Sequence, residues 1–208
     1  MVVADFLTPL TVGAGDAARE QQYAAVLERV VLLLDGKTLT ATSQMHDAPT
    51  LLHPITQPSC PPTLASGEDD WIVAMSTVAS ELHAAFDYFH WTGFYRTTAP
   101  GVLKLGPYQG GTACLTIPFS RGVCGAAARE ARTQLVPDVH SFPGHIACAS
   151  STLSEIVVPV CDRSNGTAIA VLDIDSNLPA AFTASDVAGL EHLTGWLEAQ
   201  SWNAKYWP

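Results

Sequence analysis

The chain has 208 residues, of which 48% are hydrophobic and 14% charged, so it can bury one substantial core but has little room for two domains. Its formal net charge is −10 at pH 7, and no basic stripe is interleaved with aromatic residues, which argues against nucleic acid and anionic membranes as partners. The sequence shows neither a secretory signal nor an apolar run of membrane-spanning length, so we expect a cytoplasmic protein.

The first 86 residues combine two expected helices with a long irregular segment. Apolar residues at helical spacing predict a helix over 16–34, ended by Gly36, and a second helix over 71–86. Between them, residues 37–70 carry five prolines among serines and threonines, which predicts a loop or disordered insertion. Cys60 lies inside this insertion, and we expect no role for it.

After the second helix the apolar pattern changes to a period of two, which is typical of strands. It predicts strands over 90–96, 102–108 and 112–117, the first two joined by a turn at 99–101. An alanine-rich stretch over 122–133 then predicts a short helix.

The C-terminal part predicts a long hairpin followed by a helix. Residues 154–175 form two strands around Ser164–Gly166, a three-residue loop whose glycine adopts the left-handed conformation. Thr183 and Asp186 have the spacing of a reciprocal capping box and begin the last helix. Because hairpins rather than crossover helices join the strands, we expect one α+β domain over 1–208, with a mostly antiparallel central sheet flanked by helices.

The register of this hairpin brings three acidic residues to one face of the sheet. Centring the loop on Asn165 places Glu155 directly opposite Asp175. Asp173 lies two residues away on the same strand and therefore shares that face. The opposite face is predicted to be core and carries Ile156, Val158, Leu172 and Ile174.

Two interpretations of the acidic face remain open. Like charges opposite one another are unfavourable on a sheet, although a solvated outer face tolerates them with weak repulsion. Apolar neighbours on the same face favour instead a pocket lined by acids; these are Val157, Pro159 and Val171. In such a pocket the carboxylates would hold a cationic group, and one would keep its proton near neutral pH and act as a general acid.

Five cysteines are scattered through the chain, and none belongs to a Cys-x-x-Cys pair. An odd number without a signal peptide argues against a structural disulfide framework, and the spacing argues against a zinc cage. Scattered free cysteines are usually small hydrophobic core residues. Cys161, in an apolar strand, is expected to be of this kind.

Three cysteines are candidates for chemistry. Cys114 alternates with Leu115 and Ile117 and so does not belong simply to their core face. Cys124 opens the alanine-rich helix, and a helix N-terminus lowers the pKa of a thiol. Cys148 lies in a loop with turn residues on both sides, which makes it less suited to a core position.

Two histidines, His140 and His145, bracket the loop that leads to Cys148. Either could tune a thiolate or simply fill space. Because the sequence gives neither histidine a defined partner, the space-filling interpretation is favoured.

Six short segments carry a further signal: WTGFY (91–95), LGPYQG (105–110), IPFSRGVCG (117–125), DVHSFPGHIAC (138–148), SEIVVPV (154–160) and VLDIDS (171–176). In order and spacing they resemble the free methionine-R-sulfoxide reductases, which are small single-domain GAF proteins. The resemblance covers about 71–200 and, more loosely, the first helix. The insertion at 37–70 departs from the family, whose members have a short connection there.

The resemblance implies an enzyme, an L-methionine (R)-S-oxide reductase, that uses thiols without a bound cofactor or metal. In this family a thiol attacks the sulfoxide sulfur and becomes a sulfenic acid as methionine leaves, and a second thiol condenses with it to a disulfide that thioredoxin reduces. Matched by motif, Cys148 is the attacking thiol and Cys114 the resolving thiol. Cys124 is the third family cysteine and an alternative partner.

The resemblance also assigns the substrate site. Glu155, Asp173 and Asp175 match the family's substrate-binding carboxylates, and Glu155 and Asp175 also match the groups that act in catalysis. Trp91 matches the aromatic wall for the substrate's methyl group, with Tyr95 beside it. Carboxylates that hold the α-ammonium would restrict the enzyme to the free amino acid, because a methionine within a protein lacks that group.

Two rival functions use the same features. A ligand-sensing GAF module would bind a small molecule without chemistry, although such modules usually carry an output domain for which this chain has no room. A thiol-based peroxide sensor would use the same cysteines. The resemblance further implies a homodimer packed through its helices and a role in oxidative stress.

Overall fold

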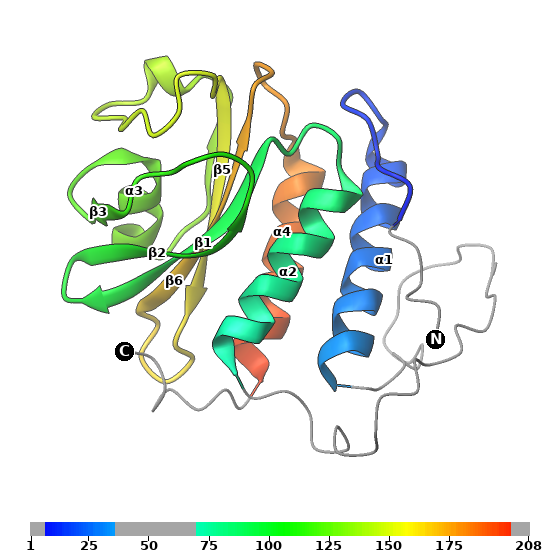
Figure 1. The fold of residues 1–208 in the computed structure, drawn as a ribbon, viewed down its shortest axis with the longest axis horizontal. Coiled ribbons are helices and arrows are strands. Elements are labelled where there is room, and N and C mark those ends of the chain that lie inside the picture. The colour runs from blue at the N-terminus through cyan, green and yellow to red at the C-terminus, as the bar shows by residue number, and fades with distance from the viewer. Residues whose placement is uncertain (1–6, 36–69, 201–208) are drawn as a thin grey trace.

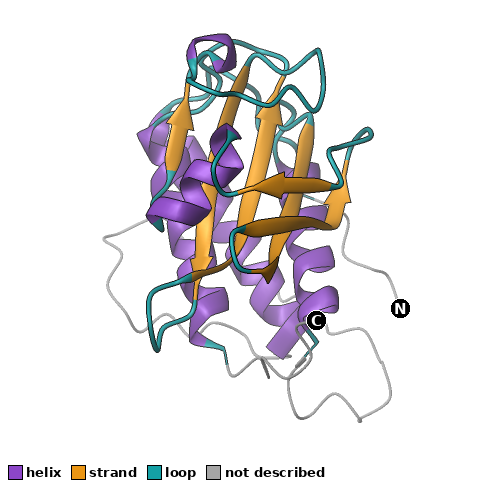
Figure 2. Ribbon diagram, turned by 90° about the vertical axis from the view of Figure 1, so that its left-hand side faces the viewer, coloured by secondary structure: helices purple, strands orange, loops and turns teal. Residues whose placement is uncertain are grey.

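The computed structural model describes residues 7–35 and 70–200, in which a six-stranded sheet lies between helices (Figures 1 and 2). The expected α+β fold with an antiparallel central sheet is confirmed. The predicted insertion at 37–70 lies outside the described residues apart from Asp70, and so does Cys60.

The helices cover the two faces of the sheet unequally. Two of the described helices pack directly on one face of the sheet, a third packs on the outer side of these two, and a fourth lies alone on the other face (Figures 1 and 2). The first two are α2 (Trp71–Ala85) and α4 (Ala184–Ala199), the third is α1 (Asp16–Asp35), and the fourth is α3 (Gly122–Glu130). No helix in the described part of the chain is both long and apolar enough to cross a membrane.

All neighbouring strands of the sheet are antiparallel, in the order β3-β2-β1-β6-β5-β4. The strands are β1 (Trp91–Ala99), β2 (Val102–Gln109), β3 (Thr116–Pro118), β4 (Gln134–Val136), β5 (Ser154–Cys161) and β6 (Ala168–Ser176). β4 and a following 3₁₀ turn, Val139–Ser141, have three residues each and were not predicted, because so short a segment shows no periodicity.

The prediction of a strand over 112–117 is wrong for its first part. The strand that pairs with β2 is limited to Thr116–Pro118, with one more backbone hydrogen bond from Leu105 N–H to the Leu115 carbonyl, and the residues before Leu115 form a loop that carries Cys114. Leu115 and Ile117 do not share a core face either, since Leu115 is 73% exposed while Ile117 is buried. Alternation in the sequence therefore mimicked a strand where the backbone makes no ladder.

The β5–β6 hairpin has the predicted register but a different turn. Glu155 pairs with Asp175, as expected, and Gly166 has the predicted left-handed conformation with φ +72°. However, the backbone N–H of Asp162 bonds to the carbonyl of Thr167, so the turn is one residue longer than the three-residue loop. An irregularity in the pairing next to Val160 absorbs the extra residue and restores the register.

The sheet separates two hydrophobic clusters. The cluster under α1, α2 and α4 contains the four hairpin residues predicted to be core, all at most 1% exposed: Ile156, Val158, Leu172 and Ile174. The second cluster lies on the opposite face, where α3 packs against β5 and β6. It includes Trp91, Tyr95, Val157 and Val171, which are the apolar neighbours of the acidic residues.

A fully buried acid, Asp186, ties α4 to α1 on the three-helix face. Its carboxylate forms an ion pair with Arg19 and accepts hydrogen bonds from the hydroxyls of Tyr23 at 2.9 Å and Tyr88 at 2.8 Å. The same carboxylate accepts the backbone N–H of Thr183 at 2.7 Å, which completes the predicted capping box. Every polar atom of this carboxylate is thus paired.

Candidate functional site

The three acids of the hairpin line a small cavity. Glu155 and Asp173 are only 6% and 5% exposed, so the solvated-face interpretation is wrong and the pocket interpretation holds. The first turn of α3 and the loop that precedes β5 cover the acids and close the cavity. This cover consists of Gly122, Val123, Cys124, His145, Ile146, Cys148, Ala149 and Thr152, and Ile117 completes the lining.

The electrostatics of this cavity favour bound protons. Burial raises the pKa of Asp173 to about 6. Burial first, and then repulsion from the neighbouring carboxylates, raises the pKa of Glu155 and of Asp175 well above the usual range. Among the residues that the structure describes, no lysine or arginine lines the cavity to offset these charges. The raised pKa values favour a protonated carboxyl in the cavity near neutral pH, and burial contributes more to this than like charge.

Cys124 does not have the lowered pKa that its helix position predicted. It is buried, and its Sγ donates toward Oε1 of Glu155 over 3.9 Å. Burial and the charges of Asp173 and Glu155 raise its pKa well above the ordinary value. A helix N-terminus contributes only about 0.3–1 kcal/mol, too little to compensate for such surroundings. Cys124 is a protonated thiol and belongs to the acid cluster.

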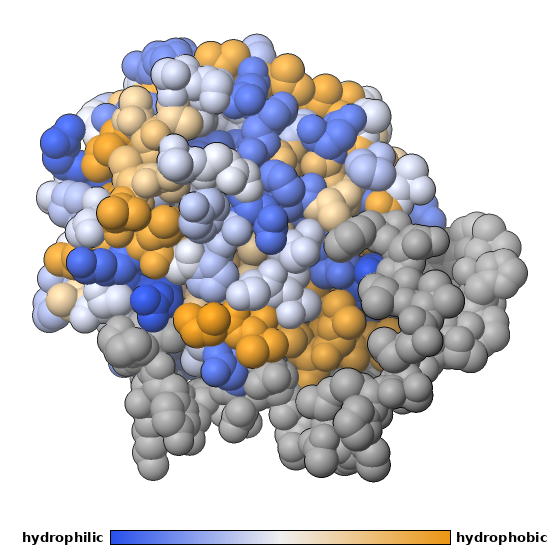
Figure 3. Space-filling view, viewed as in Figure 1, coloured by the Kyte–Doolittle hydropathy of each residue, from blue (hydrophilic) through white to orange (hydrophobic). Residues whose placement is uncertain are grey.

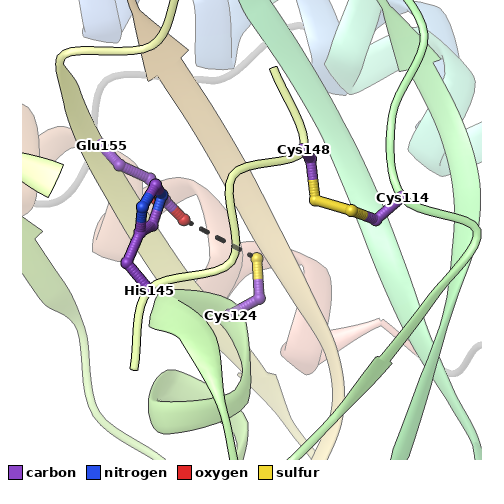
Figure 4. Close-up of a disulfide and its surroundings, with 5 residues drawn as sticks. All are labelled: Cys114, Cys124, His145, Cys148 and Glu155. Atoms are coloured by element: carbon purple, nitrogen blue, oxygen red, sulfur yellow. Dashed lines mark hydrogen bonds and ion pairs between the residues drawn. A yellow bond between two sulfur atoms is a disulfide. The ribbon is translucent and has the colours of Figure 1, made fainter. Parts of the chain in front are cut away.

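Cys114 and Cys148 form a disulfide at the rim of the cavity (Figure 4). Both lie in loops, 34 residues apart in sequence, and their Cα atoms are 5.2 Å apart. Cys148 lines the cavity, and both cysteines are partly buried. The two cysteines that the resemblance paired are thus brought together, whereas Cys161 is free and partly buried at the end of β5.

The two histidines differ, contrary to the expectation that both only fill space. Nε2 of His145 lies 3.9 Å from Oε2 of Glu155, and the two side chains point toward each other (Figure 4). Burial, and then the charge of His140, lowers the pKa of His145, so its ring is mostly neutral at pH 7 and does not cancel the acids' charge. His140 is exposed. Only the folding of the loop distinguishes these two histidines.

Trp91 and Tyr95 lie on the acidic face of the sheet, beside the cavity. Trp91 pairs with Asp175 across the strands, and its ring stacks on Tyr95 at 5.9 Å and on Tyr108 at 5.4 Å. The ring lies over Gly93, where an added Cβ would come within 2.6 Å of the indole. A glycine is therefore needed at this position. Tyr108 was not predicted, although its place in LGPYQG is a usable signal.

The assembled site combines proton donors with a pair of thiols that can be oxidised and reduced. In the disulfide-bonded state the cavity volume is about 20 Å³, which is room for roughly one water molecule. The lining therefore offers proton transfer from a neutral carboxyl and two-electron chemistry at Cys148 within one small space.

Comparisons with known proteins show which family this chain is similar to. The family model described as "GAF domain" matches residues 70–200. Two proteins named "Free methionine-R-sulfoxide reductase" are similar. The one from Saccharomyces cerevisiae is 42% identical over 62% of this chain and 75% of its own length; the one from Escherichia coli is 40% identical over 65% and 80%. The structure of the free methionine-R-sulfoxide reductase from Neisseria meningitidis with its substrate superposes with a TM-score of 0.65 and 32% identity, covering 92% of this chain and 94% of that one.

Proposed function

This chain belongs to the GAF domain family and, within it, to the free methionine-R-sulfoxide reductases, and on that premise we propose that it reduces free L-methionine-(R)-sulfoxide to methionine. The chain is therefore an oxidoreductase of the methionine sulfoxide reductase kind. The observation that carries the proposal is the Cys114–Cys148 disulfide at the rim of a buried acid pocket.

The first step takes place at Cys148. Its thiolate attacks the sulfoxide sulfur while a neutral carboxyl, Glu155 or Asp175, protonates the sulfoxide oxygen and makes the sulfur electrophilic. The oxygen passes to the sulfur of Cys148 as a sulfenic acid, and methionine leaves. The substrate sulfur gains two electrons and Cys148 loses two. The raised pKa values of the acids support this role.

The second step forms the disulfide. The thiol of Cys114 attacks the sulfenic sulfur of Cys148, and the sulfoxide oxygen leaves as water. An external dithiol, which we take to be thioredoxin, then supplies two electrons and two protons to regenerate both thiols. Cys124 is poorly suited to resolve the sulfenic acid, because its thiol is buried and protonated.

Substrate binding is proposed to use the remaining carboxylates and the aromatic wall. Asp173 and one of its neighbours would pair with the α-ammonium, which explains a preference for the free amino acid. The ring of Trp91, held by Gly93 and Tyr95, would contact the S-methyl group. A cavity of about 20 Å³ is too small for this substrate, so reduction of the disulfide would have to release the covering loop first.

A coupled assay tests the activity. Protein, thioredoxin, thioredoxin reductase and NADPH are incubated separately with the R and S epimers of methionine sulfoxide, and methionine is quantified. We expect NADPH oxidation and methionine only with the R epimer. A ligand-sensing module would bind without producing methionine. A peroxide sensor would consume NADPH with peroxide but not with sulfoxide.

We also propose a cytoplasmic homodimer packed through its helices. Apolar side chains gather over the ends of α1 and α2 that lie lowest in Figure 1 (Figure 3), and the exposed ones on these helices are Leu33, Ile72 and Val73. A redox-active disulfide that is regenerated by thioredoxin suits a reducing compartment. Sedimentation equilibrium should give twice the mass of one chain. A measured mass of one chain would rule out the proposed dimer.

A further inference from the structure

The cavity brings together donor atoms that suit a metal ion. Sγ of Cys124 and one carboxylate oxygen each of Glu155 and Asp173 lie within 4.8 Å of one another, and all three residues are buried. In a tetrahedral zinc site with Zn–S near 2.3 Å and Zn–O near 2.0 Å, neighbouring ligand atoms are roughly 3.5 Å apart. The Cys124–Glu155 separation of 3.9 Å is already close to this value. A contraction of about 1 Å would complete the set.

A second, independent observation indicates that a ligand is missing from this arrangement. Oδ1 of Asp173 is buried and makes no hydrogen bond with any described residue, although the side chain lines the cavity. A buried acceptor without a partner is unfavourable, and a cation or a donor in the cavity would relieve it. The cavity volume of about 20 Å³ accommodates a single ion but not an amino acid.

A fourth donor stands beside the trio. Nε2 of His145 lies 3.9 Å from the second oxygen of Glu155, and the His145 side chain is only 14% exposed. It belongs to a loop, so a small movement of the imidazole would bring it to the ion. A thiolate, an imidazole and carboxylates form the donor set that zinc accepts and that calcium and magnesium do not favour.

We propose that the disulfide-bonded protein binds one zinc ion in this cavity, with Cys124, Glu155, Asp173 and His145 as ligands. Binding displaces the protons of the thiol and of the protonated carboxyls to solvent, and no electrons move, because zinc is not redox-active. Zinc and the substrate would then compete for Glu155 and Asp173. This last consequence rests on the proposed function, whereas zinc binding itself does not.

Cobalt titration of the disulfide-bonded protein tests the site without any turnover. The starting protein carries Cys60→Ser and Cys161→Ser, so that Cys124 is its one remaining thiol. We expect one equivalent of Co²⁺ to produce a thiolate-to-cobalt absorption band and the intense visible bands of tetrahedral cobalt, and one equivalent of Zn²⁺ to abolish both. Absence of a thiolate band in this protein would overturn the proposal.

Further substitutions assign the ligands. Cys124→Ser should remove the thiolate band, and Asp173→Asn, which preserves shape, should weaken Zn²⁺ binding by on the order of a hundredfold. His145→Ala should weaken binding similarly, while the matched control His140→Ala should not. Circular dichroism tests whether each variant folds. If Cys124→Ser does not fold, the Zn²⁺ affinity of Asp173→Asn tests the proposed site. Wild-type affinity in Asp173→Asn would overturn the site, even if the protein reduces methionine sulfoxide normally.

Discussion

Two groups of buried carboxylates lie on opposite faces of the same sheet, and they differ in how they are paired. Asp186, under the three-helix layer, has the guanidinium of Arg19, two tyrosine hydroxyls and a backbone N–H as partners. Glu155, Asp173 and Asp175, under α3, have one another, a protonated thiol and the largely neutral ring of His145, and one oxygen of Asp173 has no partner among the described residues.

The difference separates stability from function. A buried acid whose charge and lone pairs are satisfied holds two helices together and is left with nothing to bind. A buried acid cluster without a cation raises its own pKa values and lowers stability, which is tolerated where a ligand or a proton is to be used. Substitutions on the two faces should therefore affect different measurements.

The largest expected effect is a loss of catalysis, caused by a substitution in the site on the face of the sheet that α3 covers. Cys148→Ser should abolish turnover of free methionine-R-sulfoxide in the coupled assay, because serine is not a nucleophile under these conditions. The variant should fold normally, since Cys148 lies in a partly buried loop. Cys161→Ser, a change of the same kind at a thiol outside the cavity, is the matched control and should retain activity. Appreciable activity in Cys148→Ser would show that Cys148 is not the nucleophile.

Cys114→Ser should separate the first turnover from the later ones. One equivalent of methionine should still form, because the attack needs only Cys148, while recycling through thioredoxin should slow strongly. Rapid-quench measurement of methionine per active site distinguishes the two phases. Equal multi-turnover rates in wild type and in a Cys114→Ser, Cys124→Ala double variant would contradict the resolving role.

On the opposite face, the effect should be on folding. Arg19→Met removes the cation from Asp186 and should lower the free energy of unfolding by about 3–5 kcal/mol, since it leaves an uncompensated buried charge. Urea denaturation measures this. Arg129→Met breaks an exposed pair with Glu130 and a hydrogen bond to the Phe119 carbonyl, and it should lower the free energy of unfolding much less, because solvent screens an exposed pair. If both variants lost a comparable free energy of unfolding, burial of the Arg19–Asp186 pair would contribute little to the stability of the fold.

The acids should show a smaller kinetic effect than the nucleophile. Glu155→Gln or Asp175→Asn should lower kcat/KM on the order of a hundredfold, the usual scale for a general acid. N-acetylation of the substrate should harm the wild type strongly but harm less the variant that has lost its ammonium partner. If N-acetylmethionine sulfoxide is reduced as well as the free amino acid, the carboxylates do not bind the ammonium.

The smallest expected effect is a pH dependence of stability. Because the pKa of Asp173 is raised to about 6, the folded state holds a proton that the unfolded chain has already lost at pH 5. The acid cluster therefore loses stability as the pH rises from 5 to 7. His83 and His145, whose pKa values are lowered, act in the opposite direction, so the wild type must be compared with Asp173→Asn.

In a metal-free buffer, the Tm of the wild type should fall relative to that of Asp173→Asn over this pH range. One pKa unit corresponds to about 1.4 kcal/mol, so a relative fall of a few °C is expected for a chain of this size. Parallel Tm profiles for the two proteins would show that the cluster does not titrate as proposed.

Local patterns in the sequence determined the elements and their faces. Alternation and a turn glycine were enough to place Glu155 opposite Asp175 on one side of the sheet, because side chains of a strand alternate with a period of two. The spacing of Thr183 and Asp186 likewise determined the start of α4, since a capping box is made within a single turn. The resemblance, not these patterns, identified Cys114 and Cys148 as partners.

Only the tertiary structure decided what those faces became. α3 and the covering loop bury the acids, which converts an exposed charged face into a cavity and raises the pKa of Cys124, where the helix position alone predicted a lower one. The same loop gives His145 its contact with Glu155 and brings Cys148 to Cys114. Desolvation and contact between distant segments depend on what packs on top of a residue. A local pattern contains no information about that.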